Sequence, residues 1–133
     1  MKPLDETNKK TKQRHGFVTA WLILMIIGNS STALFYLFAG DIMALNFPNG
    51  ISLSMRILYA VLSIANVIFS AILFNWKKIG FWGYTLIAIV VSITNVTIGV
   101  EIMQSVFGLA GIAILYGVLQ IKKDNITAWS NLD

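Results

Sequence analysis

Four apolar segments, each about 20 residues long, constrain this chain more than any other feature of its sequence. They cover residues 16–40, 55–76, 79–100 and 103–121. A helix needs about 20 mostly apolar residues to cross the ~30 Å hydrocarbon core of a bilayer. The runs are long and continuous rather than alternating, which favours helices over the strands of a barrel. The sequence therefore predicts an all-α integral membrane protein with four transmembrane helices.

Composition agrees with a membrane protein, and the lengths of the links predict how the helices are arranged. Of the 133 residues, 56% are hydrophobic and 12% are charged, whereas a soluble domain is usually about 25% charged. The links at residues 77–78 and 101–102 are tight, which makes successive helices antiparallel neighbours. We therefore expect an up-down-up-down four-helix bundle over residues 16–121. Residues 1–15 and 122–133 form two tails that are too short to fold alone.

The basic residues predict the orientation of the chain in the membrane. Nine of ten lie before the first segment, between the second and third, or after the fourth, and only Arg56 lies on the other side. The nine are Lys2, Lys9, Lys10, Lys12, Arg14, Lys77, Lys78, Lys122 and Lys123. Because positive loops stay in the cytoplasm, we expect a multi-pass protein of the inner (plasma) membrane with both termini cytoplasmic. The net charge of +4 is then a topology signal, and no nucleic-acid partner is expected.

A weak internal repeat is a further interpretation of the sequence. Gly16 and Phe17 open the first segment, and Gly80 and Phe81 open the third. The second and fourth segments are each followed by a lysine pair. These matches are consistent with a parallel 2+2 repeat about the membrane normal, as some transporters have.

Polar side chains inside the apolar segments are the main candidates for a function. Such groups need partners in hydrocarbon and should face the bundle interior. We call the set the polar seam: Asn29, Ser31, Thr32, Ser63, Asn66, Ser70, Ser92 and Asn95. One interpretation is structural, with the asparagines bonding one another and the hydroxyl groups to hold the helices in register. The other is functional, with the seam lining a cavity for a small polar molecule, an ion or a lipid headgroup.

The fourth segment carries small residues where the other three carry polar ones. We expect these small residues to face the interior as well, and they are Gly108, Ala110, Gly111, Ala113 and Gly117. Within them, Ala113 and Gly117 have the four-residue spacing of a motif that lets two membrane helices approach closely. The same pair is therefore a candidate for helix association.

Charged and polar residues near the expected outer face form a second candidate group, the outer rim. Its members are Asp41, Arg56, Glu101 and Gln104. The simpler interpretation is an ion pair of Arg56 with Asp41 or Glu101 at the rim, with the arginine stem lying along apolar surface. The alternative is an outward-facing site for a cation or a headgroup.

Several classes of chemistry find no support in the residues. The sequence has no cysteine and one histidine, His15, in the polar tail, which argues against disulfides, thiolate or histidine metal sites and a metal cofactor. No serine–histidine pair, phosphate loop or paired carboxylate is present, so no enzyme and no cofactor are expected. Small multidrug resistance transporters share the size and the four spans. They carry a carboxylate within the first helix, where this chain has none, and no family is assigned.

The sequence leaves three functions in order of preference. The first is a non-enzymatic binding or accessory module that acts through the polar seam, in the bilayer, as a homo-oligomer or in a larger membrane complex. The alternative is a small oligomeric channel or transporter for a small polar solute or ion. The third is a lipid-modifying enzyme that uses Asp41 and Glu101.

Overall fold

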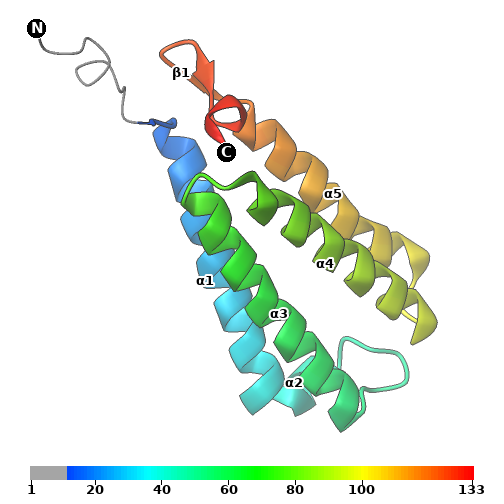
Figure 1. Ribbon diagram of the computed structural model, residues 1–133. Coiled ribbons are helices and arrows are strands. Elements are labelled where there is room, and N and C mark those ends of the chain that lie inside the picture. Colours follow the sequence, from blue (N-terminus) through cyan, green and yellow to red (C-terminus); the bar gives the residue numbers. More distant parts are fainter. Residues whose placement is uncertain (1–11) are drawn as a thin grey trace, which may run out of the picture.

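The computed structural model describes residues 12–133, so Lys2, Lys9 and Lys10 lie outside the described residues. It is built from helices, with one small hairpin near the C-terminus (Figure 1). The helices are α1 (Gly16–Phe38), α2 (Gly40–Ala44), α3 (Leu53–Phe74), α4 (Lys78–Thr97) and α5 (Ile102–Leu119). The strands β1 (Lys122–Lys123) and β2 (Ile126–Thr127) and the 3-10 helix η1 (Trp129–Asn131) follow.

The four long helices form the predicted bundle. α1, α3, α4 and α5 are each long and apolar enough to cross a membrane. Each packs mainly against the next long helix in sequence, and α1 touches α5 far less than it touches α3 (Figure 1). The all-α four-helix bundle is thus confirmed. We call the end that carries β1, β2 and η1 the tail end, and the end that carries α2 and residues 45–52 the loop end.

The helix boundaries follow from local capping and differ slightly from those expected. The Ser52 hydroxyl accepts a hydrogen bond from the amide of Met55 at 3.2 Å and begins α3, as an N-cap serine does. The first segment was expected to run unbroken to residue 40, but α1 ends at Phe38 and α2 starts at Gly40 after a break at Ala39. Asp41 therefore lies in the first turn of α2 rather than at the end of α1.

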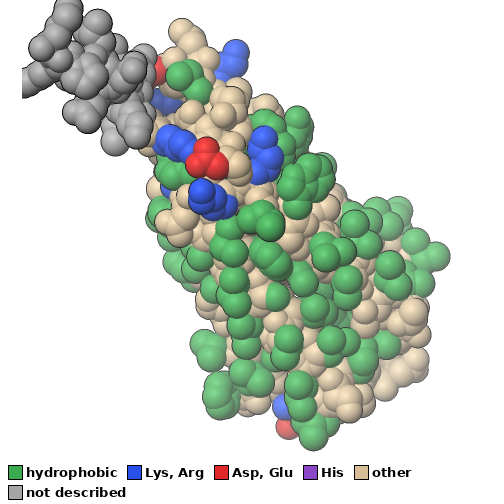
Figure 2. Space-filling model, in the orientation of Figure 1, with side chains coloured by type: hydrophobic (Ala, Val, Ile, Leu, Met, Phe, Trp, Pro, Cys, Tyr) green, Lys and Arg blue, Asp and Glu red, His purple; other side chains and the backbone are tan. Residues whose placement is uncertain are grey.

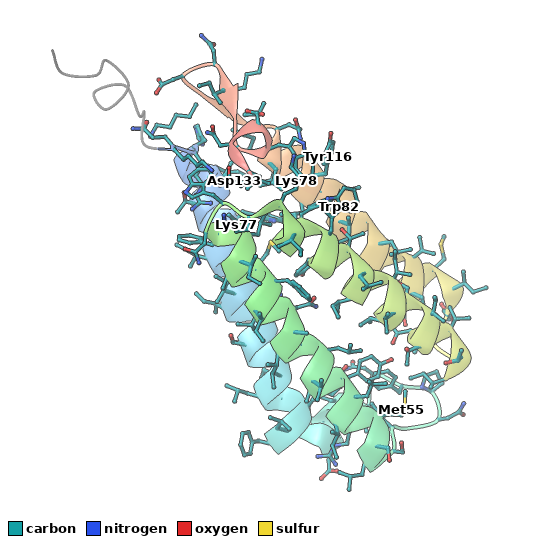
Figure 3. The ribbon with its side chains drawn as sticks, in the orientation of Figure 1. Met55, Lys77, Lys78, Trp82, Tyr116 and Asp133 are labelled. Atoms are coloured by element: carbon teal, nitrogen blue, oxygen red, sulfur yellow. The ribbon has the colours of Figure 1, made fainter. Side chains whose placement is uncertain are left out.

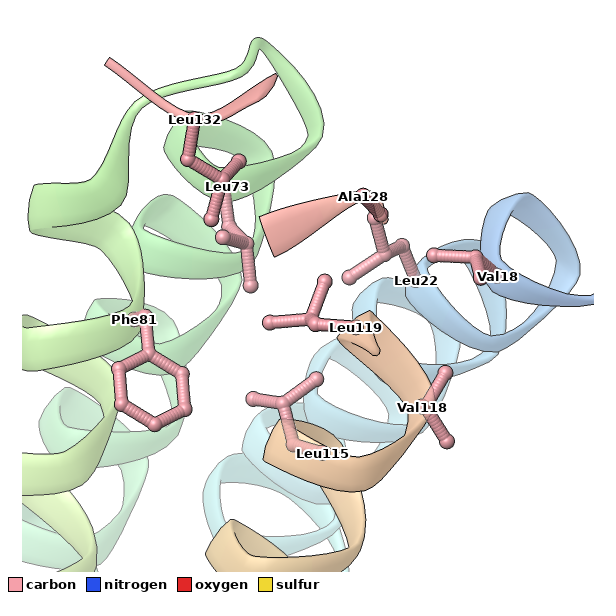
Figure 4. Packing of buried hydrophobic residues seen from close by; sticks show 9 residues of the cluster. All are labelled: Val18, Leu22, Leu73, Phe81, Leu115, Val118, Leu119, Ala128 and Leu132. Carbon is pink, nitrogen blue, oxygen red and sulfur yellow. The ribbon is translucent and has the colours of Figure 1, made fainter. Parts of the chain in front are cut away.

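The bundle is most tightly packed at its tail end. Nine buried residues from α1, α3, α4, α5 and the C-terminal tail meet there (Figure 4), and we call them the tail-end core. They are Val18, Leu22, Leu73, Phe81, Leu115, Val118, Leu119, Ala128 and Leu132. A Cβ atom on Gly80 would lie 2.5 Å from the Leu73 nitrogen and the Phe69 oxygen. Only glycine allows α4 to approach the α3 backbone this closely.

The C-terminal tail folds onto this end of the bundle, although it was expected to be too short to fold alone. The Asp133 amide donates to the Trp76 oxygen at 2.8 Å, and the Lys78 amide donates to the Asp133 oxygen at 2.9 Å. Figure 3 shows Lys77, Lys78 and Asp133 close together, far from Met55 at the loop end. The Trp129 ring packs edge-on against Phe81. The bundle supplies the apolar surface that the tail lacks.

Electrostatic contacts complete the attachment of the tail. The Asp133 carboxylate lies 2.6 Å from the Lys12 ammonium group and 3.7 Å from that of Lys77. The hydrogen bond and the charge of Lys12 hold the pKa of the Asp133 carboxyl below its usual value. Arg14 donates to the Phe74 oxygen at 2.6 Å, where α3 ends, and partial burial lowers the pKa of its guanidinium.

Apolar and charged side chains are distributed over the surface as a bilayer requires. Apolar side chains cover much of the length of the helices, whereas charged side chains gather at the two ends (Figure 2). Exposed apolar residues occur on every long helix, with Phe38 82% and Phe107 72% exposed. A water-soluble monomer rarely exposes so much contiguous apolar surface. The chain is a membrane protein.

Candidate functional site: an uncharged polar cavity

A cavity of about 340 Å³ lies within the loop-end half of the bundle. α1, α3 and α4 supply most of its wall, and the loop after α2 and the start of α5 supply the rest. Its lining consists of Asn29, Thr32, Tyr36, Asn46, Phe47, Tyr59, Leu62, Ser63, Asn66, Val91, Asn95, Val100 and Gln104. Five of these residues carry carboxamides and four carry hydroxyl groups, but none is charged. We call it the loop-end cavity.

The hydrogen bonds that Asn29 and Asn66 make to side chains of other helices are few and long. The Asn66 amide nitrogen lies 3.4 Å from the Asn29 side-chain oxygen, and the Asn29 nitrogen lies 3.4 Å from the Tyr84 hydroxyl. Protein hydrogen bonds of this kind are usually about 2.7–3.2 Å long. Asn29 also donates to the oxygen of Met25 in its own helix at 2.8 Å. The amides are thus only loosely tied to one another across the helices.

One buried acceptor in this network has no partner. The side-chain oxygen of Asn66 is buried, yet it accepts no hydrogen bond from any of residues 12–133. A buried polar atom left unpaired costs about 1–3 kcal/mol, and such atoms are few in natural proteins. Because Asn66 lines the cavity, a donor placed there could satisfy this oxygen after a rotation of the amide. The cavity therefore has unused capacity for hydrogen bonding.

Aromatic rings form one wall of the cavity. The rings of Tyr36 and Tyr59 stack with centroids 5.2 Å apart and planes 16° apart, and Phe47 lies 5.7 Å from Tyr59. The Tyr59 hydroxyl donates to the side-chain oxygen of Asn95. The structural interpretation of the seam predicts that Asn95 bonds the other asparagines. Asn95 instead accepts a hydrogen bond from a tyrosine.

The sequence places Tyr59 on the Asn66 face of its helix, and the same spacing held a signal for Tyr36 that was not used. Tyr36 follows Asn29 by seven residues, and Tyr59 precedes Asn66 by seven. Residues seven apart lie on the same face of a helix, so Tyr36 could have been placed beside Asn29 in the same way. Asn46 and Phe47 come from the loop, and no periodicity predicts their position.

Five members of the polar seam meet in the cavity, and three do not. Asn29, Thr32, Ser63, Asn66 and Asn95 line it. Ser31 is exposed on α1 and its hydroxyl donates to the Ile27 oxygen of its own helix. Ser92 is buried but donates to the Ser105 oxygen at 2.8 Å, which joins α4 to α5. Ser70 is fully buried with no partner for its hydroxyl and lies outside the cavity lining.

The outer rim separates into two parts. Arg56 lies 3.9 Å from Asp41, and its guanidinium occupies the space that a side chain on Gly40 would need. Glu101 is exposed and forms no ion pair with any of residues 12–133. Gln104 alone of the four lines the cavity. The structure thus favours Asp41 over Glu101 as the partner of Arg56.

The small residues of α5 do not form one inward face, contrary to expectation: of its three glycines, only Gly108 lies beside another helix, where a Cβ would be 3.8 Å from the Ser92 hydroxyl oxygen. All five are exposed: Gly108, Ala110, Gly111, Ala113 and Gly117. α5 instead packs through Ser105, Leu115, Val118 and Leu119. The apolar character of α5 is spread almost evenly around its axis, so its sequence does not single out an inward face. Exposure leaves the Ala113 and Gly117 pair free for contact with another helix.

The lining of the cavity carries no carboxylate, imidazole or thiol group, and apolar side chains fill the tail end of the bundle. No group of three or more histidine, cysteine, aspartate or glutamate residues occurs within residues 12–133. The tail-end core separates the cavity from the other end of the bundle with apolar side chains. No protein-family model, curated protein or solved structure matches this chain.

Proposed function

We propose that this chain is a non-enzymatic membrane module that binds a small polar group in the loop-end cavity. The unpaired oxygen of Asn66 in a cavity with no charged residue carries the proposal. The volume of about 340 Å³ falls within the ~300–1,000 Å³ of small-molecule sites. The structural interpretation of the seam is weak here, because the asparagines are joined by a single contact of 3.4 Å, between Asn66 and Asn29.

The distribution of polar groups supports binding over catalysis. Asp41 and Glu101 are both exposed, and neither lines the cavity. The lining offers amides and hydroxyl groups, which orient a ligand but are poor acids and bases near neutral pH. The module holds its ligand without changing it, as a homo-oligomer or as the accessory subunit of a larger membrane complex.

A small oligomeric channel or transporter is the second candidate. The polar lining of the cavity favours it, because amide oxygens and hydroxyl groups can replace the hydration shell of a solute. Such a path must also cross the tail-end core, where Leu22, Leu73, Leu115 and Leu119 are almost completely buried. Transport therefore requires a rearrangement of the best-packed part of the bundle, which makes it the weaker proposal.

The proposed location is the inner (plasma) membrane, with the tail end in the cytoplasm. All basic residues among residues 12–133 except Arg56 lie at the tail end, in segments next to the spans. Basic residues flanking a span are retained on the cytoplasmic side. The cavity then lies in the outer half of the bilayer. A reporter fused after Asp133 tests the orientation, because cytoplasmic activity supports it and external activity contradicts it.

Native mass spectrometry of the protein released gently from its own membrane tests the binding function. We expect one discrete adduct of small mass on the wild-type chain. Asn66→Leu should lose that adduct, whereas Asn75→Leu should keep it, because Asn75 is exposed and bonds only to Ala71 of its own helix. An unliganded wild-type chain, or equal adducts on both variants, would contradict the proposal.

A further inference from the structure

The tail-end core and the loop after α2 bound the loop-end cavity along the axis of the bundle. The tail-end core closes one end. At the other, Asn46 and Phe47 line the cavity, and Asn49 reaches across the bundle, with its amide nitrogen 3.3 Å from where a Cβ of Gly99 would lie. An entrance for a molecule from the bilayer must lie on a side of the cavity, between two helices.

The flank between α1 and α5 is the side with the least cover. Buried residues link these helices only in the tail-end core, where Val18 and Leu22 join the cluster that includes Leu115 and Leu119. Nearer the loop end, the buried cluster is built on Tyr36, Tyr59 and Ala60 and contains no residue of α5. There α5 buries only Ser105, which bonds to α4. Figure 1 shows α5 diverging from α1 toward this end.

The surface of α5 in this half is apolar, whereas the cavity behind it is polar. Ile102, Met103 and Phe107 are each at least 69% exposed. Gln104 of the same helix lines the cavity and is itself exposed. Where the flank between α1 and α5 is open, the polar groups of the cavity face the hydrocarbon of the bilayer. Such groups need a polar partner. A molecule with a polar head and an apolar chain would satisfy both surfaces at once.

The lining also restricts the charge of that head. An ion in a water-poor cavity needs a compensating charge nearby, and none of the lining residues supplies one. Carboxamides and hydroxyl groups both donate and accept hydrogen bonds, and the stacked rings of Tyr36 and Tyr59 add apolar surface to one wall of the cavity. This combination suits an uncharged head with several hydroxyl groups.

We propose that the loop-end cavity binds the uncharged, polyhydroxylated headgroup of a membrane amphiphile that enters sideways between α1 and α5. This inference rests on the binding function proposed above and adds the class of ligand and its route. The chain or chains of the amphiphile lie along the exposed apolar face of α5, and its head satisfies the Asn66 oxygen. A free polyol lacks the apolar part and binds less tightly.

Nanodiscs of defined composition test the ligand class. They contain equal amounts of a monoglucosyl diacylglycerol and a phosphatidylglycerol with the same acyl chains, and native mass spectrometry records which lipid the protein retains. We expect a preference of about tenfold for the glucosyl lipid, as one good hydrogen bond provides. Asn66→Leu should abolish the preference, and Asn75→Leu should keep it. Free glucose added in excess should not displace the lipid.

Each other outcome overturns the inference in a distinguishable way. Equal or greater retention of phosphatidylglycerol rejects the uncharged head, and displacement by free glucose rejects the amphiphile. In both cases the proposed binding function is still supported if the retention of the ligand depends on Asn66. A lipid-free dimer means that a second copy covers the flank, which also rejects the amphiphile. If Asn66→Leu changes the retention of neither lipid nor glucose, the binding function falls as well.

Discussion

The two halves of the bundle are made from the same four helices but are packed in opposite ways. At the tail end, nine buried apolar residues and the folded tail form a continuous core. At the loop end, the helices surround a cavity whose amides are only loosely tied to one another. In a bilayer, apolar side chains gain little by leaving lipid, so close packing holds helices together. The comparison indicates that the tail end stabilises the fold, whereas the loop end is available to bind a ligand.

Gly80→Ala should have the largest effect on stability, because it forces apart the closest helix pair of the tail end. Its new methyl group would lie 2.5 Å from backbone atoms of α3, and backbone cannot move aside as a side chain can. We expect a loss of about 2–3 kcal/mol in reversible unfolding in mixed micelles. Gly111→Ala is the matched control, because nothing lies within 4 Å of that site. Equal stability of the two variants would contradict this account of the helix contact.

Leu22→Ala comes next, because it opens a void in the tail-end core. Leu22 is completely buried, and deletion of its side chain should cost about 2 kcal/mol, the low end of the range for buried leucines, because apolar groups in a bilayer gain little by leaving lipid. Leu62→Ala provides the comparison at the loop end, where Leu62 already borders a cavity and is only half-buried. The same unfolding measurement should show a smaller loss for Leu62→Ala. A larger loss there would reverse the assignment of the two halves.

Asn66→Leu should change the free energy of unfolding little. Hydrogen bonds between membrane helices contribute about 0.6 kcal/mol on average, and Asn66 makes one long bond and leaves its oxygen unpaired. We expect stability within about that amount of the wild type when no ligand is bound. A loss as large as that of Leu22→Ala would show that the seam holds the bundle together.

Acidification should loosen the tail without unfolding the bundle, which is the smallest effect expected. The pKa of Asp133 is lowered by Lys12 in the folded chain. The contribution of this carboxylate is therefore present above its usual pKa and is lost as the pH falls through the lowered value. Hydrogen exchange at the Lys78 and Asp133 amides reports the change, and Asp133→Asn should exchange faster at neutral pH. Unchanged protection in Asp133→Asn would mean that backbone contacts alone hold the tail.

Sequence alone predicted the parts of this protein that depend on local composition. The four spans follow from runs of apolar residues. Five seam residues meet in the cavity because asparagine, serine and threonine avoid lipid wherever the helices allow it. The tail could not be predicted, since its structure depends on a surface supplied by other helices.

The features that the sequence did not predict depend on the rotation of helices about their axes and on contacts between residues far apart in the sequence. Most of the small residues of α5 face away from the other helices, because an almost evenly apolar helix can be turned about its axis without changing its composition. Ser31 and Ser92 satisfy their hydroxyl groups by bonding backbone oxygens of α1 and α5. Phe47 reaches the cavity through a loop whose path no periodicity sets. The candidate 2+2 repeat stays a prediction, although Gly16 lies in open space and Gly80 does not.

The most direct test of the division between the two halves measures Leu22→Ala and Asn66→Leu side by side. The free energy of unfolding of each variant is measured in mixed micelles. Its bound adduct is measured by native mass spectrometry after gentle release from its own membrane. We predict that Leu22→Ala loses stability and keeps the adduct, whereas Asn66→Leu keeps its stability and loses the adduct. If both variants lose stability equally and neither alters the adduct, the polar cavity is part of the structural core and the central claim is wrong.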